Sequence, residues 1–165
     1  MSWVALVLGL VALERIVELI YAARNTRRLL AQGAVEIGAR HYPLIVLLHL
    51  SWLVAIYALA TKDEPPLWGW IAIYLVLQAA RLWVILSLGP YWTTRIISLA
   101  DAPLIKHGPY RFLRHPNYAV VIAEIAILPL AFREPLVALF FSLVNLALLS
   151  WRLREENAAL ALRER

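Results

Sequence analysis

Five long apolar runs constrain the fold of this chain more than any other feature of its sequence. They extend over Trp3 to Ala22, Pro43 to Thr61, Leu67 to Leu88, Asn117 to Phe132 and Pro135 to Trp151. A helix needs about 20 apolar residues to cross the hydrocarbon core of a bilayer. Only 16% of the 165 residues are charged, against about 25% in soluble domains. The sequence therefore predicts an all-α integral membrane protein with about five transmembrane helices.

The last two runs are the shortest and should form a C-terminal helical hairpin. Arg133 and Glu134 interrupt the apolar sequence between them, and Pro135 suits the first position of a helix because its φ is already helical. The first run is too long for a signal peptide and has no small-residue cleavage site, so we expect a retained helix. We interpret the chain as one membrane domain, 1–165, with a three-helix part (1–88) and a second part (89–165) that contains the hairpin and the tail.

Lys and Arg residues are concentrated in two connections and the tail, all on one predicted side of the membrane. Twelve lie there: Arg24, Arg27, Arg28, Arg40, Arg95, Lys106, Arg111, Arg114, Arg152, Arg154, Arg163 and Arg165. The other side has only Lys62 and Arg133. The positive-inside rule then predicts an N terminus outside and a cytoplasmic tail. The net charge of +5 is explained by this topology and by anionic membrane lipids, so we expect no nucleic-acid partner.

Charged residues inside the apolar runs need partners, because an unpaired charge at the bilayer centre costs about 2.5 to 3.5 kcal/mol. Glu14, Arg15 and Glu18 lie close together in the first run. They predict a paired cluster that holds this helix to its neighbours, with direct substrate binding as the alternative. Glu124 is either a structural partner of a residue such as Arg81 or part of the edge of the active site.

The most unusual polar stretch, His107 to Tyr118, reads H-G-P-Y-R-F-L-R-H-P-N-Y and directly precedes an apolar run. A second polar stretch follows the last run, where Arg152 and Glu156 are four residues apart and so share one face of a helix. By itself this pair is typical of an interfacial anchor. Together the two stretches offer an acid, rings and hydrogen-bond donors, which suit a zwitterionic, adenine-bearing ligand at the cytoplasmic surface.

With G-P-Y-x-x-x-R-H-P-x-Y (Gly108 to Tyr118), a helical hairpin and R-x-x-x-E (Arg152 to Glu156), the chain resembles the isoprenylcysteine carboxyl methyltransferase and phospholipid methyltransferase superfamily. The resemblance implies S-adenosylmethionine as cofactor, with Arg152 facing the substrate and with Arg152, His115 and Glu124 as catalytic candidates. The cofactor-binding residues that it implies are Ala102, Pro103, Leu104, Ile105, Gly108, Tyr110, Arg114, His115, Pro116, Asn117, Tyr118 and Glu156. Many relatives have glycine at the position of Val120 and a further F-G-x-x-Y-x-x-Y segment, so we expect a changed lid or substrate.

The N-terminal half suggests the acceptor. E-R-x-x-E-L from Glu14 and E-x-G-x-x-H-Y-P from Glu36, with His49, resemble a bacterial branch linked to type III polyketide synthases. This resemblance implies O-methylation of a lipophilic alkylpyrone or alkylresorcinol in the inner membrane of a bacterium. A hydroxypyrone reaches the enzyme as an anion, whereas a phenol needs a base, for which His41, His49, His115 and Glu124 are the candidates. For His41 and His49 the ordinary alternative is a packed or capping histidine.

Three other functions stay open at this point. The acceptor could be a prenylcysteine carboxylate or a phospholipid. The chain could be an NADPH-dependent reductase of the sterol type, whose membrane fold is similar. It could also be a small membrane protein without enzymatic activity. Methyl transfer needs no metal, and the absence of cysteine excludes disulfides, thiolate metal sites and cysteine nucleophiles.

Overall fold

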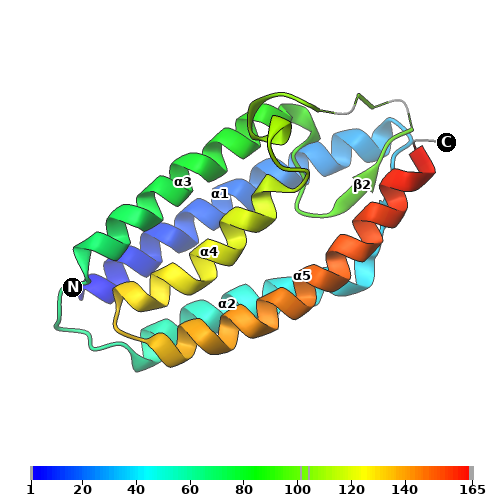
Figure 1. The fold of residues 1–165 in the computed structure, drawn as a ribbon. Helices are drawn as coiled ribbons and strands as arrows, with labels where there is room; N and C mark the ends of the chain where they lie inside the picture. Colours follow the sequence, from blue (N-terminus) through cyan, green and yellow to red (C-terminus); the bar gives the residue numbers. More distant parts are fainter. Residues whose placement is uncertain (1, 101, 104, 164–165) are drawn as a thin grey trace.

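The computed structural model describes residues 2–100, 102–103 and 105–163, with side chains through Asn157. In this part of the chain, five α-helices run up and down along one elongated bundle (Figure 1). They are α1 (Trp3–Ala31), α2 (Tyr42–Leu59), α3 (Trp68–Leu88), α4 (Pro116–Ala131) and α5 (Pro135–Arg163). The start of α1 and the end of α5 lie at opposite ends of the bundle (Figure 1). The predicted all-α architecture is confirmed.

Local sequence explains where the helices begin and end. The hydroxyl of Ser2 accepts a hydrogen bond from the backbone N–H of Ala5 over 3.2 Å and caps α1. Pro116 and Pro135 are the first residues of α4 and α5, where the missing N–H costs no helical hydrogen bond. Between these helices, Arg133 adopts the left-handed conformation with φ of 62°, which makes a tight turn. The predicted C-terminal hairpin is confirmed.

Two helices extend well beyond their apolar runs. The sequence predicts that the first helix ends near Ala22, but α1 continues to Ala31. The last run ends at Trp151, but α5 continues to Arg163. In both cases the additional turns are rich in Arg, Leu and Ala, which favour helices. Both extensions lie at the same end of the bundle (Figure 1).

The surface of the helices is apolar, as a membrane requires. Within the described residues, three helical segments are long and apolar enough to cross a bilayer: Ala39–Leu59, Trp68–Tyr91 and Pro135–Asn157. The apolar helix α4 is shorter, and α1 is not among the three, so their spanning remains a prediction. Large side chains such as Leu86, Val76 and Val54 are between 65% and 69% exposed along the bundle. An exposed apolar surface of this kind is stable in contact with lipid but not in contact with water.

A two-stranded antiparallel sheet, which we did not predict, lies at the end of the bundle where α1 and α5 extend. Val35–Ile37 (β1) pairs with Ile96–Ser98 (β2), so the α1–α2 connection is joined to the α3–α4 connection. Arg95 donates two hydrogen bonds to the carboxylate of Glu36, at 2.8 and 3.0 Å, and stacks over the ring of Tyr42 at 4.6 Å. These contacts give the long α3–α4 connection a defined position.

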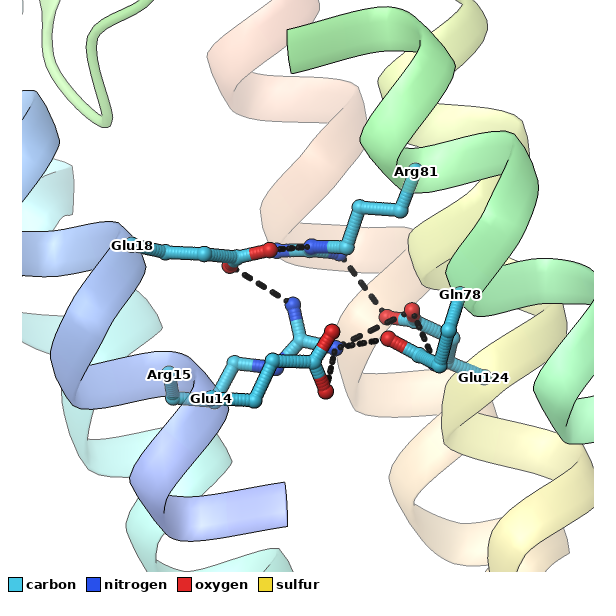
Figure 2. Close-up of polar contacts among 6 residues, drawn as sticks. All are labelled: Glu14, Arg15, Glu18, Gln78, Arg81 and Glu124. Carbon is cyan, nitrogen blue, oxygen red and sulfur yellow. Dashed lines mark hydrogen bonds and ion pairs between the residues drawn. The ribbon is translucent and has the colours of Figure 1, made fainter. Parts of the chain in front are cut away.

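A charged cluster joins α1, α3 and α4 (Figure 2), and Arg81 and Glu124 within it are buried. Its members are Glu14, Arg15, Glu18, Gln78, Arg81 and Glu124. Arg81 donates to Glu18 over 2.6 Å and to Glu124 over 2.9 Å. Arg15 donates to Glu18 over 2.8 Å and to Glu124 over 3.1 Å. The predicted pairing of the charges of the first helix is confirmed, and of the two alternatives for Glu124 the structure shows the contact with Arg81.

Candidate functional site

A cavity with a volume of about 250 Å³ lies at the end of the bundle that carries the sheet. The α3–α4 connection supplies one wall, and the start of α4 together with Arg152 and Glu156 of α5 supplies the other. Its described lining residues are Leu29, Leu88, Tyr91, Trp92, Thr93, Arg95, Ile96, Ile97, Ser98, Leu99, Ala102, Pro103, Ile105, Tyr110, Arg114, His115, Asn117, Tyr118, Arg152 and Glu156. This first cavity therefore brings together the two polar stretches that the sequence singles out.

The glycine of the motif allows its turn to approach α3 closely. Gly108 has φ of 60°, a conformation that side chains disfavour, and begins a short 3-10 helix that ends at Arg111. A Cβ atom at this position would overlap the hydroxyl oxygen of Ser87. Pro109 is buried beside it. The turn is thus pressed against α3, and this placement directs Tyr110 into the first cavity.

Glu156 is the centre of the polar contacts in the first cavity. Its carboxylate accepts a hydrogen bond from the hydroxyl of Tyr118. Nδ1 of His115 lies 3.5 Å from the other carboxylate oxygen. The rings of His115 and Tyr118 stack with centroids 5.3 Å apart and planes 11° from parallel. These contacts join the motif at the start of α4 to α5, which the sequence separates by a whole helical hairpin.

The same carboxylate affects the titration of two motif residues. The hydrogen bond to Glu156 raises the pKa of His115 above its ordinary value, because it favours the protonated ring over the neutral one. Burial raises the pKa of Tyr110 well above its ordinary value, and the negative charge of Glu156 adds to this effect. The cavity therefore presents a carboxylate, an imidazole inclined to protonate and a neutral phenol.

Arg152 is held in place by two hydrogen bonds. Its Nε donates to the hydroxyl oxygen of Tyr118 over 2.8 Å, and its Nη1 donates to the carbonyl oxygen of Thr94 over 2.9 Å. No partner for Nη2 is found among the described residues. A guanidinium group fixed at two positions and free at the third is oriented to bind an anionic oxygen.

A second cavity, with a volume of about 280 Å³, adjoins the first. It extends between α1 and α2, and most of its lining is apolar, with Ala12, Ile16, Leu19, Ile45, Val46, Leu50, Leu53, Val121 and Leu149. The two cavities share five lining residues: Trp92, Thr93, Asn117, Tyr118 and Arg152. Arg152 thus lies where the polar first cavity and the apolar second cavity meet.

Two polar atoms on this shared wall have no partner among the described residues. The side-chain oxygen of Asn117 and the indole Nε1 of Trp92 are buried without a hydrogen bond. Leaving such a group unpaired costs about 1 to 3 kcal/mol. A bound molecule that supplies one donor and one acceptor would remove this cost. The two atoms therefore favour a polar ligand at the junction of the cavities.

The structure brings most of the predicted cofactor residues to the first cavity. Those that line it are Ala102, Pro103, Ile105, Tyr110, Arg114, His115, Asn117, Tyr118 and Glu156. Gly108 and Pro116 are not among its lining residues and instead shape the backbone next to it. Leu104 lies outside the described residues. Whether this set binds a cofactor remains a prediction.

Sequence reasoning missed the segment between α3 and β2. Trp92 is buried and contributes to both cavities, and the side-chain amide of Asn25 donates to its carbonyl oxygen over 2.9 Å. Thr93 and Thr94 follow it along the second cavity. The cluster Pro90-Tyr91-Trp92 directly after a helix was a usable signal, since aromatic residues in a connection tend to pack or bind.

The four candidate bases lie in different places. His115 lines the first cavity and His49 lines the second. His41 is buried, 2% exposed, and packs edge to face against Trp151. Glu124 lies in the charged cluster and is not among the described residues that line either cavity. A direct catalytic role for Glu124 therefore remains a prediction, and its contacts are those of a structural partner.

The chain is similar in sequence to known proteins. Residues 70–162 match the family model of the isoprenylcysteine carboxyl methyltransferase (ICMT) family. The "Uncharacterized protein YpbQ" of Bacillus subtilis is 38% identical over 164 residues, which cover 97% of this chain and 96% of the relative. An "Uncharacterized protein" of Haemophilus influenzae is 26% identical over 152 residues, 89% of this chain and 88% of the relative. No solved structure matches the chain.

Proposed function

This chain belongs to the isoprenylcysteine carboxyl methyltransferase family of membrane methyltransferases, and we propose that it methylates an oxygen atom of a lipophilic acceptor with S-adenosylmethionine as donor. The observation that carries the proposal is the wall shared by the two cavities. A polar cavity suited to a zwitterion and an apolar cavity suited to a lipid meet at Arg152, Asn117 and Tyr118. Two reactants that bind on either side of this wall would be adjacent.

The first cavity has the groups that S-adenosylmethionine requires. Glu156 offers a carboxylate to the amino group, and His115 offers a donor to the carboxylate. Tyr110 and the apolar segment around Ile105 offer surfaces for the adenine ring, and the free oxygen of Asn117 accepts from a hydroxyl or amino group. When bound there, S-adenosylmethionine supplies an already activated methyl group, so no metal is needed. The remaining task of the protein is to orient the acceptor and exclude water.

Arg152 is the residue that we propose orients the acceptor oxygen. Tyr118 and Thr94 hold its guanidinium group, so the third nitrogen faces the acceptor without a loss of rotamer freedom. An acceptor that arrives as an anion would be held at this nitrogen, whereas an alkylresorcinol would first transfer its hydroxyl proton to a base, for which His115 and His49 are the candidates that line the cavities. Consecutive hydrogen bonds from Arg152 to Tyr118 and from Tyr118 to Glu156 also connect the acceptor position to the carboxylate that we propose binds the cofactor. Binding of the cofactor at Glu156 would therefore support the orientation of Arg152 toward the acceptor.

For the acceptor, we propose a long-chain alkylpyrone or alkylresorcinol. The second cavity is mostly apolar, and Ile16, Leu19 and Leu50 line it while being 53%, 41% and 58% exposed. Because these residues both line the second cavity and are exposed, we infer that this cavity opens sideways toward lipid between α1 and α2. A long tail can stay in the bilayer, at about 0.8 kcal/mol per buried methylene, while its head enters the cavity.

The predicted orientation is part of the same proposal. The first cavity lies at the end of the bundle that contains most of the loop arginines, which the positive-inside rule assigns to the cytoplasm. S-adenosylmethionine is made in the cytosol, so the orientation and the cofactor are consistent. We propose the inner membrane of a bacterium as its location.

Purified protein in detergent should be incubated with S-adenosylmethionine labelled on its methyl group and with an alkylpyrone, an alkylresorcinol or a prenylcysteine. The expected result is label in the first two lipids, with a mass gain of one methylene. A clear preference for prenylcysteine would overturn the polyketide acceptor while leaving methyl transfer intact. No label in any acceptor, with Glu156→Gln as the background control, would overturn the proposed reaction.

A further inference from the structure

The second cavity has a polar inner wall that methyl transfer at Arg152 does not explain. Arg15, Glu18 and Arg81 of the charged cluster line the cavity, and so does His49 of α2. His49 is seven residues further into the bundle than Tyr42, or about 10 Å along the helix. The cavity is therefore polar at the Arg152 end and polar again deeper in the membrane, with apolar walls between.

His49 presents a hydrogen-bond acceptor to the cavity. Its Nδ1 lies 2.8 Å from the carbonyl oxygen of Ile45. A carbonyl can only accept, so Nδ1 carries the hydrogen and the neutral ring has its lone pair on Nε2. No partner for Nε2 is found in the part of the chain that the structure describes. Edge-to-face packing on Trp52, with centroids 6.4 Å apart, sets the direction of the ring.

Arg81 presents a donor to the same cavity. Its Nε donates to Glu18 and its Nη1 donates to Glu124, as Figure 2 shows. Among the described residues, no partner is found for Nη2. The two carboxylates hold the guanidinium plane, so this third nitrogen cannot turn away easily. The inner wall thus combines one free acceptor with one free donor, which is the complement of a hydroxyl group.

We propose that this inner wall binds a second hydroxyl group of the acceptor, distinct from the oxygen that is methylated, through His49 and Arg81. The inference rests on the proposed function and narrows its substrate class to head groups with two hydroxyl groups, as an alkylresorcinol has. One oxygen meets Arg152, and the other points inward to His49. The tail leaves sideways between Ile16 and Leu50, which are both cavity lining and exposed.

The test compares an alkylresorcinol, which has two ring hydroxyls, with the alkylphenol of equal tail length, which has one. Binding of each radiolabelled lipid to detergent-solubilised protein without cofactor gives the ratio of affinities, and kcat/KM with cofactor gives a second ratio. Wild-type protein should prefer the alkylresorcinol by roughly tenfold, the effect of one well-made hydrogen bond. In His49→Leu both ratios should fall close to the value that follows from an alkylresorcinol having twice as many hydroxyl groups as an alkylphenol. His49→Gln, which retains a hydrogen-bonding group, should keep part of the preference.

Ser51→Leu is the matched control, because Ser51 lies on the same helix, donates to the carbonyl oxygen of Leu48 and is not among the described residues that line the second cavity. It should keep the wild-type ratios. Equal affinity of wild-type protein for both lipids, or an unchanged preference in His49→Leu, would overturn the inference. Binding preferences as expected but no methyl transfer to either lipid would overturn the proposed reaction instead, so the two failures are distinguishable.

Discussion

Arg152 donates a hydrogen bond from Nε to the hydroxyl oxygen of Tyr118 over 2.8 Å, and this contact lies on the wall between the two cavities. The same hydroxyl donates to Glu156. A single phenol therefore joins the residue that faces the acceptor to the residue that we propose binds the cofactor. Because the hydroxyl has one hydrogen, its donation to Glu156 leaves only lone pairs for Arg152, which gives the chain of hydrogen bonds one direction.

Replacing Glu156 by Gln should weaken the binding of S-adenosylmethionine. The change keeps the shape but removes the negative charge opposite an amino group, which should cost about 1.5 to 3 kcal/mol. Calorimetry on protein in detergent measures the affinity. Glu155→Gln is the matched control, since Glu155 accepts from Trp151 and does not line the first cavity. Equal affinities of the Glu156 variant and wild type would remove this residue from the cofactor site.

Replacing Arg152 by Lys should lower kcat more than cofactor affinity. Lysine keeps the charge but cannot donate to Tyr118 and Thr94 while presenting a third nitrogen to the acceptor. Steady-state kinetics and calorimetry together separate the two effects. Arg154→Lys, an exposed position two residues away, serves as control. Full turnover of Arg152→Lys on every acceptor would exclude the orienting role.

Replacing Glu124 by Gln should destabilise the protein by about 3 kcal/mol, because it leaves two buried guanidinium groups without one of their shared carboxylates. Denaturation in mixed micelles, followed by circular dichroism, measures the change. The exposed Glu64, which pairs with Arg133 over 3.2 Å, provides the control: Glu64→Gln should change stability by no more than about 1 kcal/mol. Unchanged stability with lost turnover would instead indicate that Glu124 acts in catalysis.

The contact between His115 and Glu156 should make the thermal stability of cofactor-free protein depend on pH. The native pKa of His115 is raised by the hydrogen bond to Glu156, so the folded state holds this proton more tightly than the unfolded chain. The stabilisation is complete below the ordinary value of about 6.5 and is lost as pH rises through the raised native value. Melting curves in detergent between about pH 5 and about pH 9 should show this decline in wild type.

In His115→Asn this component of the pH dependence should be absent. His107→Asn, an exposed histidine of the same connection, should retain it. A decline of the same size in His115→Asn and wild type would assign it to another group.

The orientation can be tested in intact cells. The excess of loop cations on the side of the tail predicts that a tag at the C terminus is protected by the inner membrane and that a tag at the N terminus is accessible from outside. Labelling with a membrane-impermeant reagent distinguishes the two. The reverse pattern would separate the first cavity from the cytosolic supply of S-adenosylmethionine and so contradict the proposed function.

The sequence alone determined the order of the helices and the turn of the hairpin, for a direct physical reason. A long run of apolar residues must satisfy its backbone internally in lipid, so each run became a helix, and Arg133-Glu134-Pro135 became the turn of the hairpin. The need to pair buried charge also made the cluster around Arg15 predictable, although not its partners. The motif and the pair Arg152 and Glu156 identified two walls of the first cavity.

Only the tertiary structure decided which side chains meet across the bundle. That Arg81 pairs with Glu18 and Glu124 together, and that Trp92 lines both cavities, depends on segments that are distant in sequence. The sheet between β1 and β2 escaped prediction because each strand has three residues, too few to show an alternating pattern. The role of His49 was ambiguous for a different reason. The sequence around a histidine on an apolar helix does not indicate what the ring faces. Only the position of the cavity shows that the ring of His49 lies on its inner wall.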